Sequence, residues 1–243
     1  MDIVKDYFSS EPVVRHYEKA AVQVGLWDSE KEVFTKQFNP NDRLIDVGTG
    51  AGRIALALCD LGYRYVIGID PSKELIRSAR KIARLYEYSV AFKTGNATQL
   101  KFEDNLFDGA IFGFNGLMQI PGRDQRRLAM QEIWRVVRPG GSFVFTSHDR
   151  GLNRWKKFWK AEQKRWDEGR QNPHLLEFGD RCEETDLGLL FIHVPTIDEV
   201  KEDLAATGWV VEADRLRSQI CNESLPVREF SDECRFWIAR KPE

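Results

Sequence analysis

Two patterns of apolar and polar residues alternate along the middle of the chain. Short runs of valine, isoleucine, leucine and phenylalanine are separated by stretches in which apolar residues recur every three or four positions. The runs are typical of strands buried on both faces, and the recurring positions predict helices with one buried side. Strands are expected at Arg43–Val47, Tyr65–Asp70, 90–94, Phe107–Phe112 and 142–147. Helices are expected to begin at Ala51 and Ser72 and to span about 124–137.

The two ends of the chain extend this core. Apolar residues recur at helical spacing over residues 12–38, which predicts a helix ahead of the first strand. Towards the other end, a helix is expected to open at Pro195, and strands are expected at 209–216 and 234–240 with a loop through Pro226 between them. No clear helix separates these last two strands, so they should pair antiparallel.

Strands that alternate with helices predict an α/β fold with a doubly wound, mostly parallel sheet. The alternation stops after the fifth strand, where a charged and aromatic stretch is interpreted as a lid. The expected segments are a helical N-terminal cap (1–40), a Rossmann-like cofactor-binding core (41–149), a lid or substrate insertion (150–192) and the C-terminal part of the sheet (193–243).

Composition narrows the class of protein. The 243 residues suffice for one large domain, and 30% charged residues, 42% hydrophobic residues and a net charge of −2 are ordinary for a soluble protein. The charge balance is not basic enough to favour nucleic acid as a partner. The four cysteines form no metal-ligand pair, and no metal site is expected. A cytoplasmic location without membrane contact is expected, because neither a signal peptide nor a run of about 18 apolar residues occurs.

The chemistry begins at the glycine-rich turn after the first predicted strand. Gly48, Gly50 and Gly52 alternate with other residues, and glycine lets the backbone turn sharply and approach a ligand. Asp70 ends the next strand, where a carboxylate accepts hydrogen bonds from a ribose diol. A dinucleotide fingerprint would require a small residue at position 53, and Arg53 stands there.

This Gly-x-Gly-x-Gly spacing, with Asp46 before it and Asp70 after the second strand, resembles the class I S-adenosylmethionine-dependent methyltransferases. The Arg-Pro-Gly-Gly turn before the fifth strand is also similar to theirs. The resemblance implies a seven-stranded sheet of order 3-2-1-4-5-7-6 with the last strand antiparallel, and S-adenosyl-L-methionine as cofactor. It implies a cofactor site made of Asp46, Gly48, Thr49, Gly50, Gly52, Asp70, Pro71, Asn96, Ala97, Phe114 and Asn115.

Similarity to the family gives these residues roles, and each has a plainer alternative. Asp46 is expected to help hold the methionyl group, and Asp70 the ribose, although the Asp-Pro-Ser sequence also resembles a helix N-cap that suits Ser72 better. Asn96 stands where the family usually has an aspartate at the adenine, and it could instead form a simple turn. Phe114 and Asn115 are expected near the methionyl group, or in a glycine-rich turn.

Methyl transfer from a sulfonium mainly needs alignment and the exclusion of water, but a hydroxyl acceptor also needs a general base. His148, which precedes Asp149 at the end of the fifth strand, is the first catalytic candidate, with a capping and loop role as the alternative. His193 is the second candidate, and a buried neutral histidine at a strand end is its alternative.

The lid contains an aromatic helix face formed by Trp155, Phe158, Trp159 and Trp166, with Glu162 among them. Aromatic rings around a carboxylate suit a cationic or amine acceptor, so Glu162 is a third catalytic candidate. The alternative, which we favour, is a stripe facing the core in which Glu162 pairs with a lysine or arginine. The basic residues of the lid are read as a solvated helix face, with an anionic substrate or RNA as the alternative.

The sequence therefore predicts an enzyme that methylates nitrogen or oxygen of a small-molecule acceptor by in-line displacement. The alternatives are an RNA or protein methyltransferase and a non-catalytic regulator that binds the cofactor. A nicotinamide oxidoreductase is disfavoured by Arg53. The acceptor and the oligomeric state are left open.

Overall fold

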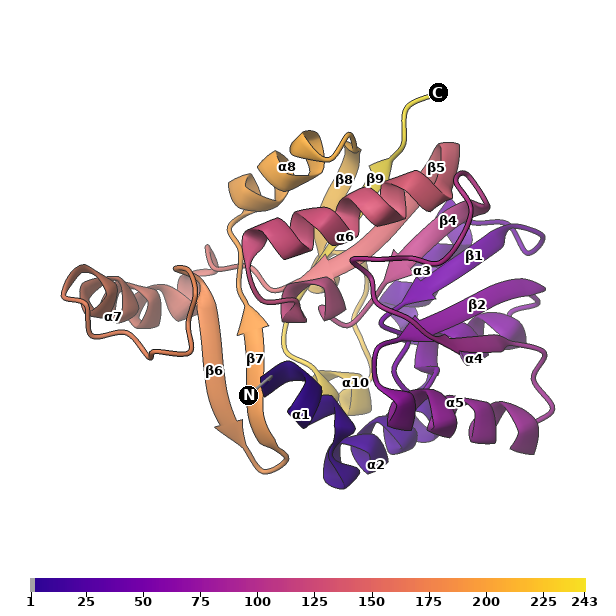
Figure 1. Cartoon of the computed structure of the whole chain (residues 1–243), viewed down its shortest axis with the longest axis horizontal. Coiled ribbons are helices and arrows are strands. Elements are labelled where there is room, and N and C mark those ends of the chain that lie inside the picture. The colour runs from indigo at the N-terminus through magenta and orange to yellow at the C-terminus, as the bar shows by residue number, and fades with distance from the viewer. Residues whose placement is uncertain (1–2) are drawn as a thin grey trace.

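The computed structural model describes residues 3–243, and its centre is one twisted seven-stranded sheet (Figure 1). The strand order is β3-β2-β1-β4-β5-β9-β8, in which β9 runs antiparallel to both of its neighbours. This confirms the predicted order, since the β6–β7 hairpin stands outside the sheet. The strands are β1 (Arg43–Val47), β2 (Tyr65–Asp70), β3 (Ala91–Thr94), β4 (Phe107–Phe112), β5 (Val137–Ser147), β8 (Val210–Leu216) and β9 (Arg235–Arg240).

Helices cover both faces of the sheet. Side chains along a strand alternate between the faces, so Phe143 and Phe145 of β5 join one apolar core while Val144 joins the other. The first core holds α6 (Arg123–Val136) and α8 (Ile197–Ala206). The second holds α3 (Asp28–Gln37), α4 (Arg53–Asp60) and α5 (Lys73–Leu85). The doubly wound fold follows from this alternation.

The N-terminal cap differs from the single helix that was predicted over 12–38. The structure has α1 (Ile3–Ser9), α2 (Glu11–Lys19), a π-helical turn η1 (Ala20–Val24) and then α3. Gly25 breaks the run with a φ of +63°, a left-handed conformation that glycine adopts readily. Its carbonyl accepts a hydrogen bond from Nη1 of Arg53 at 2.8 Å. The break in the helix at Gly25 therefore coincides with a contact to Arg53, which is distant in the sequence.

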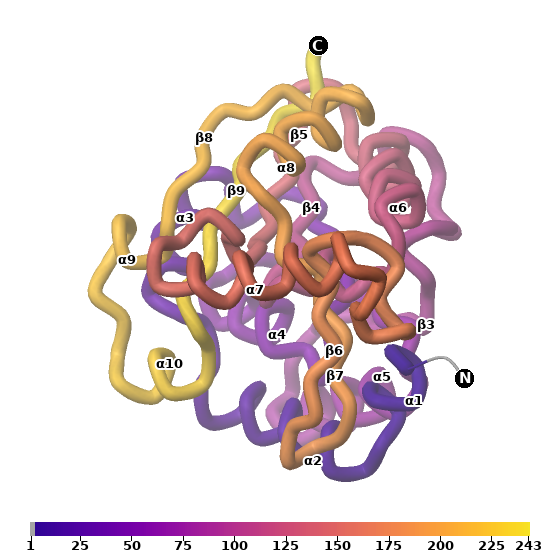
Figure 2. The backbone as a smooth tube through the Cα atoms, turned by 90° about the vertical axis from the view of Figure 1, so that its left-hand side faces the viewer, coloured from indigo at the N-terminus to yellow at the C-terminus, as the bar shows by residue number. Residues whose placement is uncertain are grey.

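The segment after β5 projects from the body of the molecule in Figure 1 and faces the viewer in Figure 2. It consists of a 3₁₀ turn η3 (Asn153–Trp155), α7 (Lys156–Asp167) and the antiparallel hairpin β6 (Asp180–Thr185) and β7 (Gly188–His193). This hairpin was not predicted. Its β7 strand contacts α1 and the short turn η2 (Gly116–Gln119), so it links the projecting segment to the cap.

Two smaller differences concern the edges of elements. β5 begins at Val137, ahead of the glycine turn, and α6 ends at Val136. The segment expected to be a loop through Pro226 contains α9 (Arg217–Ile220) and α10 (Leu225–Phe230). Proline fits the first turn of a helix, because the amide there needs no intrahelical partner. No helix within residues 3–243 is long and apolar enough to cross a membrane.

Candidate functional site

A cleft of about 980 Å³ opens at the carboxyl ends of the central parallel strands. This is where open α/β sheets bind their ligands. The glycine-rich turn after β1 forms the floor, and side chains from both ends of the chain form the roof. The roof residues are Val4, Phe8, Tyr17 and Phe230.

Two of the three loop glycines are required by the packing around them. Gly48 has a φ of +65°, and a Cβ on it would lie 2.5 Å from the ring of Phe112. Gly52 has a φ of +91°, and a Cβ there would lie 2.8 Å from the ring of Phe92. Gly48, Thr49 and Gly50 line the cleft, whereas Gly52 does not. Gly52 is the residue that precedes α4, and a contact of Gly52 with the cofactor remains a prediction.

Asp46 lies at the base of the cleft, only 2% exposed. Its Oδ2 accepts a hydrogen bond of 2.6 Å from the Thr49 hydroxyl. Burial raises the pKa of Asp46 to about 7, against the lowering effect of that hydrogen bond. A buried carboxylate of this kind is well placed to pair with a cationic group of a ligand, because such a partner would offset its desolvation.

Asp70 ends β2 on the other side of the loop, 7% exposed. Its Oδ2 accepts from the Gly50 amide at 3.0 Å, and its Oδ1 accepts from the Ser72 amide at 2.8 Å. Burial raises the pKa of Asp70 to about 6 in spite of these bonds. The two amides fix the carboxylate while each oxygen retains capacity for a further donor. Ser72 caps α5 by accepting from Leu75, as expected.

The turn after β3 completes this side of the cleft. Pro71, Asn96 and Ala97 all line it. Oδ1 of Asn96 accepts from the Thr98 amide at 3.0 Å, so the plainer alternative, a turn, is present. A contact of Asn96 with adenine remains a prediction.

Arg53 has a function that the sequence did not reveal. Its guanidinium forms two hydrogen bonds of 2.6 Å with the carboxylate of Glu30, which is fully buried. It also lies over the Trp27 ring at 4.8 Å. Position 53, which excluded a dinucleotide fingerprint, therefore ties the glycine-rich loop to the N-terminal cap.

The turn after β4 separates two residues that were expected together. Phe114 and Asn115 both adopt left-handed conformations, with φ values of +49° and +58°. Phe114 lines the cleft and stacks on Phe230 with ring centroids 5.0 Å apart. Asn115 does not line the cleft. Its backbone N–H donates to the Thr146 hydroxyl at 2.8 Å, and its side-chain amide points to His148. A contact of Asn115 with the cofactor remains a prediction, to which this orientation lends no support.

His148 lies behind this turn and has a defined tautomer. Its Nδ1 is 2.9 Å from the carbonyl oxygen of Glu233, which can only accept, so Nδ1 carries the proton. Nε2 then accepts from Nδ2 of Asn115 at 3.2 Å. Burial lowers the pKa of His148, so the imidazole is neutral. The ring lines a second cavity, not the cofactor cleft. Asp149 forms an ion pair with Arg235 at 2.9 Å, in keeping with a structural role for Asp149.

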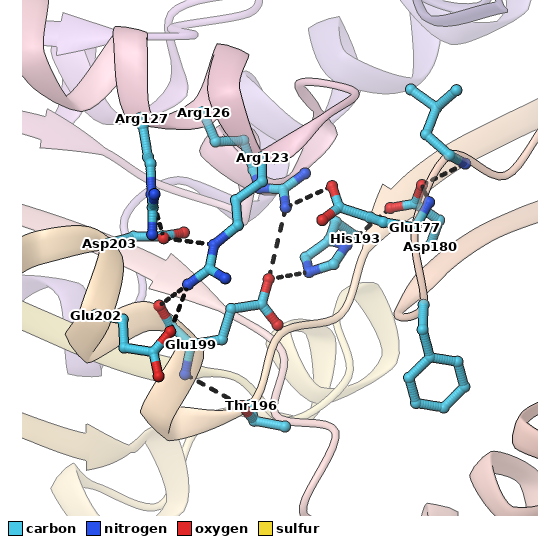
Figure 3. Close-up of polar contacts among 12 residues, drawn as sticks. Arg123, Arg126, Arg127, Glu177, Asp180, His193, Thr196, Glu199, Glu202 and Asp203 are labelled. Atoms are coloured by element: carbon cyan, nitrogen blue, oxygen red, sulfur yellow. Dashed lines mark hydrogen bonds and ion pairs between the residues drawn. The ribbon is translucent and has the colours of Figure 1, made fainter. Parts of the chain in front are cut away.

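His193 lies outside both cavities, in a network of charged residues that joins β7 to α6 and α8 (Figure 3). Nδ1 contacts Asp180 and Nε2 contacts Glu199, each at 2.7 Å, and the ring is fully buried. Burial alone would lower the pKa of His193, but the two carboxylates outweigh it and raise the pKa. These contacts agree with the alternative of a buried histidine at a strand end, and a catalytic role of His193 remains untested.

The same network contains a group of residues with metal-ligand chemistry. Donor atoms of Glu177, His193 and Glu199 lie within 4.8 Å of one another. Arg126 already pairs with Glu177 at 2.9 Å and with Glu199 at 3.6 Å. The guanidinium of Arg126 thus supplies a positive charge that balances the Glu177 and Glu199 carboxylates.

The aromatic stripe of the projecting segment packs largely as the plainer alternative expects, although Trp155 and Trp159 also line the second cavity. Trp159 is buried and packs edge-on against Phe178, and Trp166 packs against the same ring. Glu162 forms an ion pair with Arg165 and lines neither cavity. Of the aromatic residues in the cap, Tyr17 lines the cleft, whereas Trp27 packs between Arg53 and Phe114.

Comparisons with known proteins agree with this geometry. Residues 44–141 match the family model described as methyltransferase domain. The chain is 30% identical over 145 residues to a demethylmenaquinone methyltransferase of Symbiobacterium thermophilum, covering 56% of this chain and 55% of that protein. It is 33% identical over 132 residues to a ubiquinone/menaquinone biosynthesis C-methyltransferase of Nitrobacter hamburgensis, covering 51% of each. The chain thus spans about half the length of these curated relatives.

Solved structures share the fold over nearly the whole chain. A SAM-dependent methyltransferase from Methanosarcina mazei superimposes with a TM-score of 0.71 at 23% identity, covering 90% of this chain and 99% of that one. Magnesium protoporphyrin IX methyltransferase from Synechocystis, with bound SAH, gives 0.63 at 14% identity and 98% coverage of both. At these identities the likeness concerns the fold.

Proposed function

We propose that this chain is a class I S-adenosylmethionine-dependent methyltransferase that methylates a small molecule, and the fold and the match of residues 44–141 support this. The observation that carries the proposal is the cleft in which Asp46 and Asp70 flank the glycine-rich loop. The N-terminal helices and α10 roof this cleft, which favours a small acceptor over a long polymer.

The residues present fit S-adenosylmethionine. Asp46 would pair with the ammonium of the methionyl group, and the fixed carboxylate of Asp70 would accept from the two ribose hydroxyls. Ala97 would pack on the adenine, and the ring of Phe114 would lie against the methionyl end. When bound, the cofactor supplies a methyl carbon made electrophilic by its positively charged sulfur. The protein's part is to align the acceptor with that carbon and to exclude water.

We propose nitrogen or oxygen as the methylated atom, with His148 as the general base. The neutral imidazole has its proton on Nδ1, where the Glu233 carbonyl holds it, and so presents Nε2 as a proton acceptor. A neutral histidine can take the proton that a hydroxyl or an ammonium must lose.

Methylation at carbon is a second candidate function. A relative is named as a C-methyltransferase of ubiquinone and menaquinone biosynthesis, and the cleft has an aromatic roof that suits a ring-shaped acceptor. The rings of Phe8, Tyr17, Phe114 and Phe230 provide that surface.

The test has two stages. Calorimetry with S-adenosylhomocysteine should show binding, and NADH should show none. Tritium from methyl-labelled S-adenosylmethionine should then enter a phenol, amine or quinol metabolite pool, and mass spectrometry of the product identifies the methylated atom. Label in RNA or protein would refute the small-molecule assignment. Cofactor binding without any transfer would favour a regulator.

A further inference from the structure

A second cavity, of about 580 Å³, shares no lining residue with the cofactor cleft in the part of the chain that the structure describes, but its His148 contacts Asn115, the residue that follows Phe114 of the cleft. It is bounded by the end of β5, by α7, by one face of the β6–β7 hairpin and by the loop before β9. The hairpin contributes Leu190 and Ile192, which lie two residues apart and so project from the same face of β7. Trp155 and Trp159 of the projecting segment contribute flat aromatic surface. The cavity therefore suits a molecule with a flat apolar body.

Four of the five charged groups that line this cavity within residues 3–243 form ion pairs with one another or with neighbours, and the fifth, Glu233, accepts from the Ser218 amide at 3.3 Å. Arg181 forms an ion pair with Glu183. Asp149 pairs with Arg235 at 2.9 Å, and Asp232 lies 3.6 Å from Arg154. A ligand with a net charge would have to compete with these partners for a counter-ion and would lose its hydration. The charge pattern thus favours a neutral ligand.

One polar group of the cavity is suited to recognise such a ligand. Nε2 of His148 is an acceptor, because the proton of the ring is held at Nδ1 by the Glu233 carbonyl. Its partner in the structure is the side-chain amide of Asn115, at 3.2 Å. An O–H or N–H group of a ligand could replace that amide, and the exchange would keep Nε2 hydrogen-bonded.

Asn115 is poised for this exchange. It is 4% exposed, yet its Oδ1 has no hydrogen-bond partner within residues 3–243. Its left-handed φ of +58° follows that of Phe114, a pair of sparsely populated conformations that store strain at functional turns. Phe114 lines the cleft and His148 lines the cavity, so Asn115 stands between the two spaces. An unsatisfied buried amide has less to lose by moving than a satisfied one.

We propose that the second cavity binds the methyl acceptor, a neutral flat molecule whose O–H or N–H group donates to His148 and displaces the amide of Asn115. This rests on the proposed function. The acceptor's oxygen or nitrogen forms a bond to the methyl carbon while the carbon–sulfur bond breaks with its electron pair on sulfur. The acceptor's proton passes to Nε2, and Nδ1 remains bonded to Glu233. Asn115 is a positioning residue, because its side-chain amide occupies Nε2 of His148 until an acceptor arrives.

The experiment uses saturation-transfer NMR and probes of matched shape on the protein with S-adenosylhomocysteine bound. The probe 4-ethylphenol is neutral and has a donor, whereas 4-ethylanisole lacks the donor. Tyramine and 4-hydroxyphenylacetate add a positive and a negative charge. We expect 4-ethylphenol to bind best, with the anisole about three- to tenfold weaker, the scale of one neutral hydrogen bond. Absence of saturation transfer to 4-ethylphenol, or tighter binding of a charged probe, would overturn the proposal.

Variants locate the binding. Leu190→Trp fills the cavity and should abolish phenol binding, whereas Lys160→Ala, on the exposed side of α7, is the matched control that should retain it. His148→Phe should remove the preference for phenol over anisole. Asn115→Gly keeps the left-handed backbone and frees Nε2, so phenol binding should tighten about threefold; a merely structural amide would weaken it instead.

S-adenosylhomocysteine affinity is measured for each variant by calorimetry and separates the two hypotheses. The proposal predicts unchanged affinity for this nucleoside in Leu190→Trp and His148→Phe, since neither residue lines the cleft. Phenol binding that survives both variants would refute the acceptor cavity while leaving the cofactor site intact. Failure of the wild-type protein to bind the nucleoside would refute the proposed function itself.

Discussion

The ion pair between Glu30 and Arg53 offers the sharpest test of how the cofactor loop is held. The Glu30 side chain is 0% exposed and that of Arg53 is 9% exposed. The Glu30 carboxylate accepts two bonds of 2.6 Å from the guanidinium and one of 3.0 Å from the Trp27 amide. Glu30→Gln keeps the shape and removes the charge, which leaves a buried guanidinium without its counter-ion.

The expected loss follows from this burial. Removing one partner of a buried pair costs about 3–5 kcal/mol, and the remaining amide oxygen places Glu30→Gln near 3 kcal/mol. For a chain of this size the melting temperature should fall by about 6–12 °C. The exposed pair of Glu11 and Arg15 supplies the control, because both side chains are about three-quarters exposed. Glu11→Gln should cost no more than about 1 kcal/mol.

Urea unfolding followed by circular dichroism measures both variants. A loss for Glu30→Gln within 0.5 kcal/mol of the Glu11→Gln control, about the scatter of surface substitutions, would refute the reasoning. The double variant Glu30→Met, Arg53→Met should recover most of the stability, since a well-packed apolar pair can replace a buried ion pair. Its affinity for S-adenosylhomocysteine then reports whether the charges also position the loop.

Four further results are expected. Asp70→Asn should weaken S-adenosylhomocysteine binding by about 1.5–3 kcal/mol in calorimetry, the worth of hydrogen bonds to a charged group, and an unchanged affinity would remove Asp70 from the site. The same affinity should fall as the pH drops below about 7, because the raised pKa values of Asp46 and Asp70, about 7 and 6, let protons neutralise both carboxylates; a flat profile from pH 8 to 5 would contradict this. The raised pKa of His193 means that the protonated ring stabilises the fold. This contribution is fully present below the unfolded pKa of about 6.5 and is lost as the pH rises through the folded pKa. The urea midpoint of the wild-type protein should therefore fall across that pH range, and the midpoint of His193→Gln should change less. Gly48→Ala should cost about 1–3 kcal/mol in urea unfolding, since its φ is left-handed and a Cβ meets Phe112, and a neutral effect would refute that clash.

The core of the fold was predictable because its signals are local. Strands buried on both faces read as apolar runs, and the spacing of Gly48, Gly50 and Gly52 marks the loop without reference to anything distant. Asp46 and Asp70 could be assigned to the cleft for the same reason, since each ends or nearly ends a predicted strand.

The remaining features depend on contacts between distant residues. The break at Gly25 involves Arg53, which is 28 positions away. The hairpin was missed because β6 is rich in charged residues and reads as part of a charged insertion. The orientation of Asn115 could not be predicted, because it depends on Thr146 and His148, which are distant from it in the sequence.

The roof of the cofactor cleft has a consequence for how this protein can be divided. Phe8 and Tyr17 come from the first helices and Phe230 from α10, whereas residues 44–141 contain the entire family match. A fragment trimmed to that match would keep Asp46, Asp70 and the glycines but leave them open to water, with Arg53 stripped of Glu30. The smallest unit that encloses a cofactor therefore comprises segments from nearly the full chain. A fragment cut at the bounds of the family match would lose the residues that cover the cleft.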